Sequence, residues 1–325
     1  MDFQFLQNPL TKKWIVSAPR RAKRPDVGEG DKPVCPFCII KDGQETEVYR
    51  VSAPNPEIAK KLFDVESDWL VRVINNKFPF APIHEIVIHS PSHNHNFDEL
   101  TLHQIELIIK IYRQRFRVHQ GKGQVYIFHN RGERAGESLP HPHTQIVVIP
   151  SSVAMQIPTL DQGSYVGTAP HAPEIDGLDG KVEKVSNHLE LEEMVETPHF
   201  YLFCPKTSEW PDETWMVPKK RNQSFAEVND GEIADFSWTL RRLLQIFKIR
   251  NPERFFFNFY IYPGKDWYLR LIPRVKRLGG FEVGTGIYVN TQDPKETIKF
   301  FKEHFHNPNE ELIIKDFLAE YRHGV

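Results

Sequence analysis

The segment His141-Pro-His-Thr-Gln145 places two imidazole rings and a carboxamide at every second position. Successive side chains of a β-strand point to opposite faces, so a strand over 141–149 would gather these three side chains on one face. The opposite face would carry Pro142, Thr144, Ile146 and Val148. Because a neutral imidazole is both a nucleophile near pH 7 and a common metal ligand, the pattern indicates chemistry on this strand.

The residues before this strand form a glycine-containing loop, N-x-G-x(3)-G-x-S, which runs from Asn130 through Gly136 to Ser138. Backbone N–H groups of such loops bind phosphate, and a serine hydroxyl adds a donor. An imidazole beside the loop, such as that of His143, can attack phosphorus and divide one difficult displacement into two. The alternative is a buried histidine pair satisfied by backbone carbonyls. Phosphate chemistry is favoured because loop, histidines and glutamine occur together.

A second group of reactive residues is the Cys35-Pro-Phe-Cys38 motif. Two thiolates at this spacing can bind one Zn²⁺ and leave two tetrahedral positions for other ligands. A redox pair and two inert buried cysteines are the alternatives, and the redox interpretation is weaker because no βαβ pattern surrounds the motif. Spacing alone leaves the further ligands open among His84, His89, His93, His95 and His141.

A third group is the basic run RRAKRP at residues 20–25. Arg21 and Arg24 can clamp a diphosphate through bidentate hydrogen bonds. A short basic run of this kind is also typical of a solvated turn, so the motif alone decides little.

Composition restricts the class of protein. A length of 325 residues suggests about two domains, and a net charge of −2 gives no electrostatic case for nucleic acid or an anionic membrane as partner. No run approaches the ~18 apolar residues that span a bilayer, and the first residues lack the apolar core of a secretion signal. Three cysteines are too few for a disulfide framework. We therefore expect a soluble cytoplasmic protein.

The elements that must position these residues recur in the same order in both halves of the chain. Each half has strands, then an amphipathic helix, then a hairpin. In the first half these are strands 68–76 and 85–91, helix 98–119 opening on Asp98 as its cap, and strands 124–130 and 143–150; in the second they are strand 213–220, helix 229–249 and strands 254–264 and 266–274. Residues 151–190, rich in proline and glycine, are expected to be a linker or a long surface excursion. The pattern predicts a duplicated α+β unit.

With these residues identified, the chain resembles the galactose-1-phosphate uridylyltransferases, the transferase branch of the histidine-triad superfamily. The resemblance extends over nearly the whole chain. It rests on the RAKRP turn, CPFC, SPSH at 90–93, the stretch from Asn130 to Gln145, and GFE and NTQ near the C-terminus. It implies two tandem histidine-triad-like units, each an antiparallel sheet (half-barrel) packed with helices. Residues 1–165 would be the catalytic unit with a zinc site, and 166–325 a second unit that lacks the histidines.

The resemblance also implies roles for the residues of the HPHxQ segment and its loop. His143 would be the nucleophile that carries a nucleoside monophosphate as a covalent intermediate. Gln145, which replaces the last histidine of the related hydrolases, would hold the phosphoryl oxygens. Ser138 and Gly136 would bind the phosphates, and Asn130 would lie at the nucleotide.

The family's structural zinc is held by two cysteines and two histidines. By resemblance these are Cys35, Cys38, His93 and His141. A metal that holds His141 would fix the chain two residues from the nucleophile.

By the same resemblance Arg21 and Arg24 are the basic pair at the phosphates. Lys276 and Gln292 match positions that hold the sugar phosphate of the second substrate, and Glu282 falls in the matching GFE. Active sites in this family draw on both subunits of a dimer, so a homodimer with shared sites is expected.

The sequence departs from the family in its second half. Tyr268 and Arg270 stand where the histidines of a second metal site would fall, so no second metal is expected. The segment GFEVGTGIYVNTQ, residues 280–292, is longer than usual between its glutamate and its glutamine. A related branch with a GTGIYVN-like segment transfers adenylyl groups from ADP-sugars to phosphate.

The resulting hypothesis is a nucleotidyltransferase of galactose metabolism that works by double displacement. His143 would take a uridylyl group from UDP-glucose and pass it to galactose 1-phosphate. The alternatives are an ADP-sugar phosphorylase that uses the same histidine, a histidine-triad hydrolase, which Gln145 disfavours, and a non-catalytic zinc-stabilised nucleotide-binding module.

Overall fold

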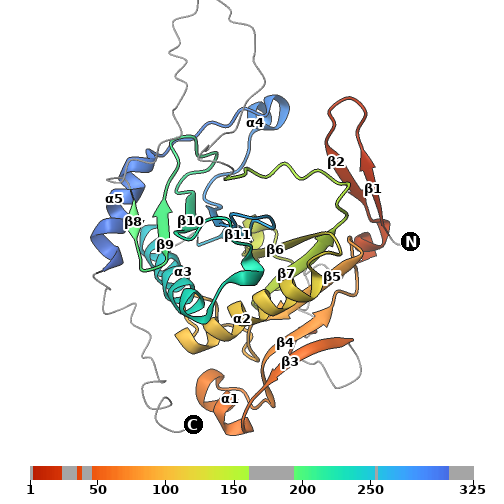
Figure 1. The fold of residues 1–325 in the computed structure, drawn as a ribbon, viewed down its shortest axis with the longest axis vertical. Coiled ribbons are helices and arrows are strands. Elements are labelled where there is room, and N and C mark those ends of the chain that lie inside the picture. Colours follow the sequence, from red (N-terminus) through yellow and green to blue (C-terminus); the bar gives the residue numbers. More distant parts are fainter. Residues whose placement is uncertain (1–2, 24–34, 39–45, 161–193, 253–254, 307–325) are drawn as a thin grey trace, which may run out of the picture.

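The computed structural model describes residues 3–23, 35–38, 46–160, 194–252 and 255–306. Its centre is a ten-stranded sheet in the order β3-β4-β5-β7-β6-β11-β12-β10-β9-β8, with every neighbouring pair antiparallel (Figure 1). The first half of the chain supplies β3 (Glu47–Ser52), β4 (Trp69–Asn75), β5 (Ile83–Ile88), β6 (Gln124–Arg131) and β7 (His143–Ile149). The second half supplies β8 (Val195–Glu196), β9 (Phe200–Phe203), β10 (Thr214–Pro218), β11 (Phe257–Ile261) and β12 (Leu269–Pro273).

The strand order is that of a duplicated unit. Reading outward from the contact between β6 and β11 gives β7, β5, β4 and β3 on one side and β12, β10, β9 and β8 on the other. A long helix precedes β6 in the first half (α2, Leu102–His119) and β11 in the second (α3, Asp230–Arg250). The predicted α+β class with two tandem units is confirmed, and the two sheets join edge to edge into one. The division at 165/166 lies outside the described residues and stays a prediction.

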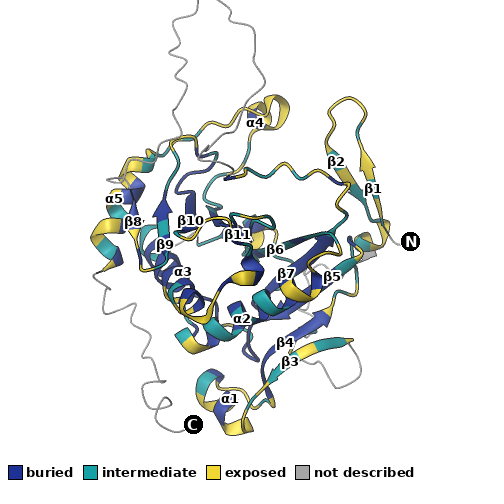
Figure 2. Ribbon diagram, viewed as in Figure 1, coloured by how far each residue is buried: buried dark blue, intermediate teal, exposed yellow. Residues whose placement is uncertain are grey.

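The two helices cover one face of the sheet and form the main core with it. Ile105, Ile109 and Tyr112 of α2 are fully buried and pack in the same cluster as Ile146 and Val148 of β7. Figure 2 shows the buried strands at the centre of the molecule and the exposed surface at its edges. Since the even positions of β7 face this core, the odd positions, His143 and Gln145, face the other side of the sheet.

The start of α2 differs from the prediction. Thr101 is its N-cap, and the Thr101 side chain accepts a hydrogen bond from the Gln104 amide at 3.2 Å. Asp98 lies before the cap and instead accepts a hydrogen bond from Lys248 Nζ at 2.7 Å. At the start of α3, Asn229 and Glu232 form a capping box.

Strand β7 begins at His143, as the predicted strand 143–150 has it, and not at 141, where the alternation of the HPHxQ segment would start it. Pro142 has no N–H and cannot donate to a ladder, although its carbonyl accepts from the His89 amide at 3.1 Å. The regular pairing with β5 therefore starts where His143 lies opposite Ile88. His141 belongs to the turn that leads into the strand.

The remaining elements lie at the periphery. Strands β1 (Gln4–Gln7) and β2 (Trp14–Ser17) form a separate hairpin, and η1 (Pro19–Lys23) follows in place of the expected basic turn. Elements that the sequence pattern did not predict are β1, β3, α1 (Pro56–Phe63), η2 (Glu133–Ala135), β8, β9, η5 (Phe225–Glu227), α4 (Gly280–Thr285) and α5 (Pro294–Phe305). Of the expected linker, residues 151–160 are described, and Leu160 is buried in a cluster with Tyr260 and Tyr268.

Within the described ranges, no helix combines the length and the apolarity needed to cross a bilayer.

Candidate active site and metal centre

His143 lies on the face of β7 away from the helices, with a relative exposure of 6%. Its Nδ1 lies 2.9 Å from the backbone carbonyl oxygen of His141. Because a carbonyl oxygen only accepts, Nδ1 carries the proton and the lone pair of the neutral ring is on Nε2. The ring of Phe37 packs edge-on against His143 at a centroid distance of 5.3 Å. This tautomer gives Nε2 the electronic form of a nucleophile.

The backbone of His143 is held from the other face of the sheet. His129, on β6, donates from Nδ1 to the His143 carbonyl oxygen at 2.9 Å and lies 3.2 Å from the Thr144 hydroxyl. Burial, together with the neighbouring His143, lowers the pKa of His129 to about 3, so the ring is neutral. Sequence patterning missed His129, and its position in the strand before the loop was the available signal.

Gln145 follows on the same face as His143. Its Oε1 lies 2.9 Å from Nε2 of His84 on β5. His84 was one of the open metal-ligand candidates, and the structure places it at Gln145 instead. His89 is also away from the cysteines: it is fully buried on the helix side, and its Nε2 lies 2.8 Å from the Thr144 hydroxyl.

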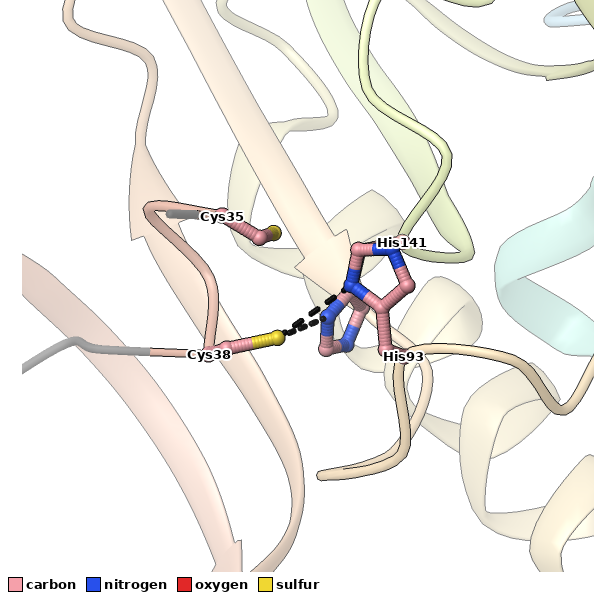
Figure 3. A group of neighbouring side chains, drawn as sticks. All are labelled: Cys35, Cys38, His93 and His141. Atoms are coloured by element: carbon pink, nitrogen blue, oxygen red, sulfur yellow. Dashed lines mark hydrogen bonds between the residues drawn. The ribbon is translucent and has the colours of Figure 1, made fainter. Parts of the chain in front are cut away.

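The two histidines of the implied zinc set, His93 and His141, lie at the cysteines. The ligand atoms of Cys35, Cys38, His93 and His141 are all within 4.8 Å of one another (Figure 3). Cys38 Sγ is 3.3 Å from His93 Nδ1 and 3.4 Å from His141 Nδ1. Two sulfurs and two imidazole nitrogens from three chain segments are the donor set of a structural zinc site. This cluster can bind a metal.

The surroundings of the cluster support metal binding. His141 donates from Nε2 to the Ser90 carbonyl oxygen at 2.9 Å, which turns the lone pair of Nδ1 toward the sulfur of Cys38. Burial and the neighbouring Cys35 raise the pKa of the Cys38 thiol to about 11. Burial lowers the pKa of His141 to about 4. A metal would therefore displace thiol protons and bind a neutral imidazole.

The glycine loop is built around Gly132, whose φ is +84°. A β-carbon there would meet the Phe256 ring at 2.0 Å, so the position requires glycine. The loop uses several of its own N–H groups: those of Ala135 and Glu137 donate to the Gly132 carbonyl, and that of Gly136 donates to the Glu133 carbonyl. Ser138, half-buried between this turn and His141, follows the internally bonded part of the loop.

An asparagine of the second unit holds this loop. Asn258, on β11, lies opposite Asn130 on β6. Its Nδ2 donates to Asn130 Oδ1 and to the Ala135 carbonyl oxygen, both at 2.8 Å. Sequence patterning missed Asn258, although the duplication places Asn130 and Asn258 on corresponding strands.

Of the predicted arginine pair, Arg21 is described and Arg24 lies outside the described residues. Arg21 Nη1 donates to the Phe78 carbonyl oxygen at 2.6 Å, and its guanidinium lies 4.8 Å above the Phe80 ring. Phe80 in turn packs edge-on against His84 at 4.5 Å. Through this stack Arg21 is linked to the residue that contacts Gln145.

Lys276, Glu282 and Gln292 lie together in a different part of the chain. Lys276 Nζ is 2.7 Å from Glu282 Oε1 and also contacts the Val289 carbonyl oxygen. The Gln292 amide donates to Asn290 Oδ1 at 3.0 Å. Among the described residues, the hydrogen bonds of Lys276 and Gln292 stay within segment 276–292, and none of them links these two residues to His143.

The second unit has other chemistry at the positions of the expected histidines. Arg270 Nε donates to Glu213 Oε1 at 2.7 Å, and Arg270 Nη2 donates to Glu209 at 3.0 Å. The Tyr268 hydroxyl donates to the Pro158 carbonyl oxygen at 2.6 Å. These two positions therefore hold a buried ion pair and a tyrosine whose hydroxyl is hydrogen-bonded to the backbone.

Known proteins resemble this chain in sequence. Residues 76–150 match the family described as galactose-1-phosphate uridyl transferase, N-terminal domain. An ADP-glucose phosphorylase of Arabidopsis thaliana is 26% identical over 91% of this chain and 92% of its own length. A galactose-1-phosphate uridylyltransferase of Haemophilus influenzae is 28% identical over 80% of this chain and 79% of its own length.

Solved structures share the fold. An ADP-glucose phosphorylase from Arabidopsis thaliana with bound ADP-glucose superposes with a TM-score of 0.62, at 23% identity over 93% of this chain and 99% of that one. A uridylyltransferase superposes with a TM-score of 0.64, at 17% identity over 92% of this chain and 97% of that one. The resemblance to galactose-1-phosphate uridylyltransferases is confirmed. The chain is an enzyme of the nucleotidyltransferase and phosphorylase class.

Proposed function

We propose that the protein transfers a nucleotidyl group from a nucleoside-diphosphate sugar to a phosphate-bearing acceptor through a covalent adduct on His143. The observation that carries this proposal is the hydrogen bond from His143 Nδ1 to the His141 carbonyl. It leaves the Nε2 lone pair on the face that also carries Gln145, beside the loop that ends at Ser138.

In the first step Nε2 of His143 attacks the α-phosphorus of the nucleotide sugar. An N–P bond forms and the bond from the α-phosphorus to the bridging oxygen breaks. The bonding electrons leave with the sugar 1-phosphate, and the adduct keeps its proton on Nδ1. In the second step a phosphate oxygen of the acceptor attacks the same phosphorus, the N–P bond breaks, and its electrons return to Nε2.

The residues around His143 would stabilise the charge that develops on the phosphoryl oxygens. The Gln145 amide nitrogen, the Ser138 hydroxyl and the Arg21 guanidinium are the donors we assign to this task. Asn130 would contact the nucleotide, on a loop held in place by Asn258.

A metal at Cys35, Cys38, His93 and His141 would be structural zinc in this proposal. When bound, it would supply rigidity: it would fix His141, whose carbonyl oxygen sets the tautomer of His143. The transfer steps themselves are carried by protein side chains.

Two candidate activities differ in the nucleotide that is transferred and in the acceptor that receives it. The uridylyltransferase matches support transfer of a uridylyl group from UDP-glucose to galactose 1-phosphate. The near full-length match to an ADP-glucose phosphorylase supports transfer of an adenylyl group from an ADP-sugar to inorganic phosphate. Both use the same adduct chemistry at His143.

We further propose that two copies share their active sites. Segment 276–292 carries Lys276 and Gln292 and exposes Phe281 (54%), Val283 (70%) and Ile287 (60%). Apolar side chains at this exposure fit burial against a second copy of the chain. In such a dimer the two polar residues would reach the sugar phosphate in the partner's site.

The test is to incubate the wild-type protein separately with UDP-glucose and ADP-glucose and to measure its intact mass. We expect an adduct of one nucleoside monophosphate with one of the two, released by galactose 1-phosphate or by inorganic phosphate. His143→Gly should form no adduct and should not turn over. Turnover retained in this variant would refute the covalent mechanism.

A further inference from the structure

Segment 276–292 leaves the sheet after β12 and ends just before α5. Its helix, α4, is largely exposed at the edge of the molecule (Figure 2). Among the described residues, Asn290 is the one member of this segment that forms hydrogen bonds with residues outside it, and the other hydrogen bonds of the segment are internal. The attachment of the segment therefore centres on Asn290.

Backbone groups fix the direction of the Asn290 carboxamide. Its Nδ2 donates to the Ser208 carbonyl oxygen at 3.0 Å and to the Trp210 carbonyl oxygen at 3.5 Å. Its Oδ1 accepts from the Gln292 N–H at 3.0 Å. Because a carbonyl oxygen only accepts and a backbone N–H only donates, all three contacts require the same orientation of the amide. Asn290 thus joins the backbone of Gln292 to turn 208–213, which precedes β10.

The indole ring of Trp210 contacts both ends of the segment. Arg274, two residues before the segment begins, places its guanidinium 4.0 Å from the centroid of this ring. Tyr288, near the other end, lies with its ring centroid 6.2 Å away. The carbonyl oxygen of Val289, next to Asn290, contacts Lys276 Nζ. The position of Lys276 is therefore tied to that of Asn290.

Turn 208–213 is itself fixed to the second unit. Arg270 on β12 donates to Glu209 at 3.0 Å and to Glu213 at 2.7 Å. Asp212 accepts from the Thr297 hydroxyl of α5 at 2.7 Å. The buried ion pair that stands where a second set of histidines was expected thus supports the turn that holds Asn290.

We propose that Asn290 is a positioning residue, which holds segment 276–292 where Lys276 and Gln292 contact the sugar phosphate in the partner's active site. This role rests on the proposed function and its shared sites. It gives the second unit, which lacks the histidines, a part in the reaction, because its turn 208–213 sets the position of the acceptor-binding residues.

The experiment measures the second-order rate constant with which the acceptor discharges the adduct on His143. The acceptor is galactose 1-phosphate or inorganic phosphate, whichever discharges the wild type. Asn290→Asp keeps the oxygen that accepts from Gln292 and sets a second oxygen against the Ser208 carbonyl. We expect a rate constant about 10- to 100-fold lower, because the segment is pushed away from the turn.

Two further variants frame this result. Asn222→Asp makes the same exchange at an exposed asparagine of the second unit and should leave the rate constant unchanged. Tyr288→Leu, at a side chain that is 38% exposed, removes only the ring contact with Trp210 and should lower the rate constant about threefold. Unchanged rate constants in both Asn290→Asp and Tyr288→Leu would overturn the proposal.

A mixed dimer separates positioning in the partner's site from damage to the chain's own site. His143→Gly lacks the nucleophile and keeps the attachment of the segment, whereas Asn290→Asp keeps the nucleophile. The two variants are co-expressed with different affinity tags, and the mixed dimer is isolated through both tags. One of its two sites combines an intact His143 with an intact segment, so we expect about half of the wild-type turnover.

Turnover of the mixed dimer no higher than that of the Asn290→Asp protein would overturn the proposal, as would failure of the two chains to co-purify. The wild type separates this role from the proposed function. Absence of any adduct on wild-type His143 would refute the proposed function, and the role of Asn290 with it. A wild type and an Asn290→Asp protein that both form the adduct and discharge it equally fast would refute the role of Asn290 alone.

Discussion

Nδ1 of His129 donates to the backbone carbonyl oxygen of His143 at 2.9 Å, from the face of the sheet opposite the proposed reaction. The His143 side chain is held on the other face by the His141 carbonyl. The two bonds immobilise the ring and the backbone of the proposed nucleophile independently. Pre-organisation of this kind reduces the rearrangement that a reaction needs.

The buried His129 should make stability depend on pH. Its pKa is lowered to about 3 in the folded protein from an ordinary 6.5, so only the unfolded chain takes up this proton between those values. The contribution of neutral His129 to the free energy of unfolding is full above pH 6.5. It is lost as the pH falls below that value, at up to ~1.4 kcal/mol per pH unit. The free energy of unfolding, measured in urea at pH 8, 6.5, 5.5 and 4.5, should fall less steeply with decreasing pH in His129→Phe than in the wild type. Parallel curves for wild type and variant would contradict this.

Asn258 should be needed for the loop because its Nδ2 donates to two oxygen atoms. Asn258→Ala should cost ~1–3 kcal/mol of folding free energy and slow adduct formation about tenfold, since both acceptors lose their donor. Asn258→Asp should be worse, because it sets a carboxylate against the Asn130 and Ala135 oxygens. Melting temperature and adduct rate test this order, and an Asp variant better than Ala would refute it.

Removal of metal should destabilise the protein and slow the transfer together. The wild type should hold about one zinc per chain, and Cys38→Ala should lose most of it, because three ligands form a weaker site. Cys204→Ala is the matched control, since Cys204 is not one of the four ligands and its Sγ is hydrogen-bonded to the Thr214 hydroxyl. The zinc content of the purified proteins and their melting temperatures before and after chelation are the quantities to measure. Full zinc content in Cys38→Ala would contradict the ligand set.

A buried ion pair behind the site should contribute to stability as a unit. Glu85, 2% exposed, accepts from Arg115 Nε and His119 Nε2, both at 2.9 Å. Its burial acts to raise the pKa, but these donors outweigh it and hold the pKa below the ordinary value. Glu85→Gln should cost ~3–5 kcal/mol, because it leaves a buried guanidinium unpaired.

The double variant Glu85→Leu/Arg115→Met removes both charges and should recover much of that loss. Chemical denaturation at pH 7 compares the three proteins. A double variant less stable than Glu85→Gln would show that the pair is net stabilising in itself.

Sequence alone determined the local chemistry of this protein. The alternation of His143 and Gln145 on one strand, the glycine loop before them and the CPFC pair are patterns within a few residues of chain. The same holds for the duplicated order of strands, helix and hairpin, because apolar periodicity reports which side of an element is buried. The helix cap at Thr101 instead of Asp98 shows the limit of such patterns, since capping is decided by local geometry.

The tertiary structure decided which distant residues meet. His93 and His141 reach Cys38 from 55 and 103 positions away, whereas His84 turns to Gln145 and His89 enters the core. The sequence offers five similar histidines, and their own neighbours do not distinguish them. Alternation along β5 puts His84 and His89 on opposite faces of the sheet, whereas His93 and His141 lie in turns whose approach to Cys38 only the tertiary fold decides.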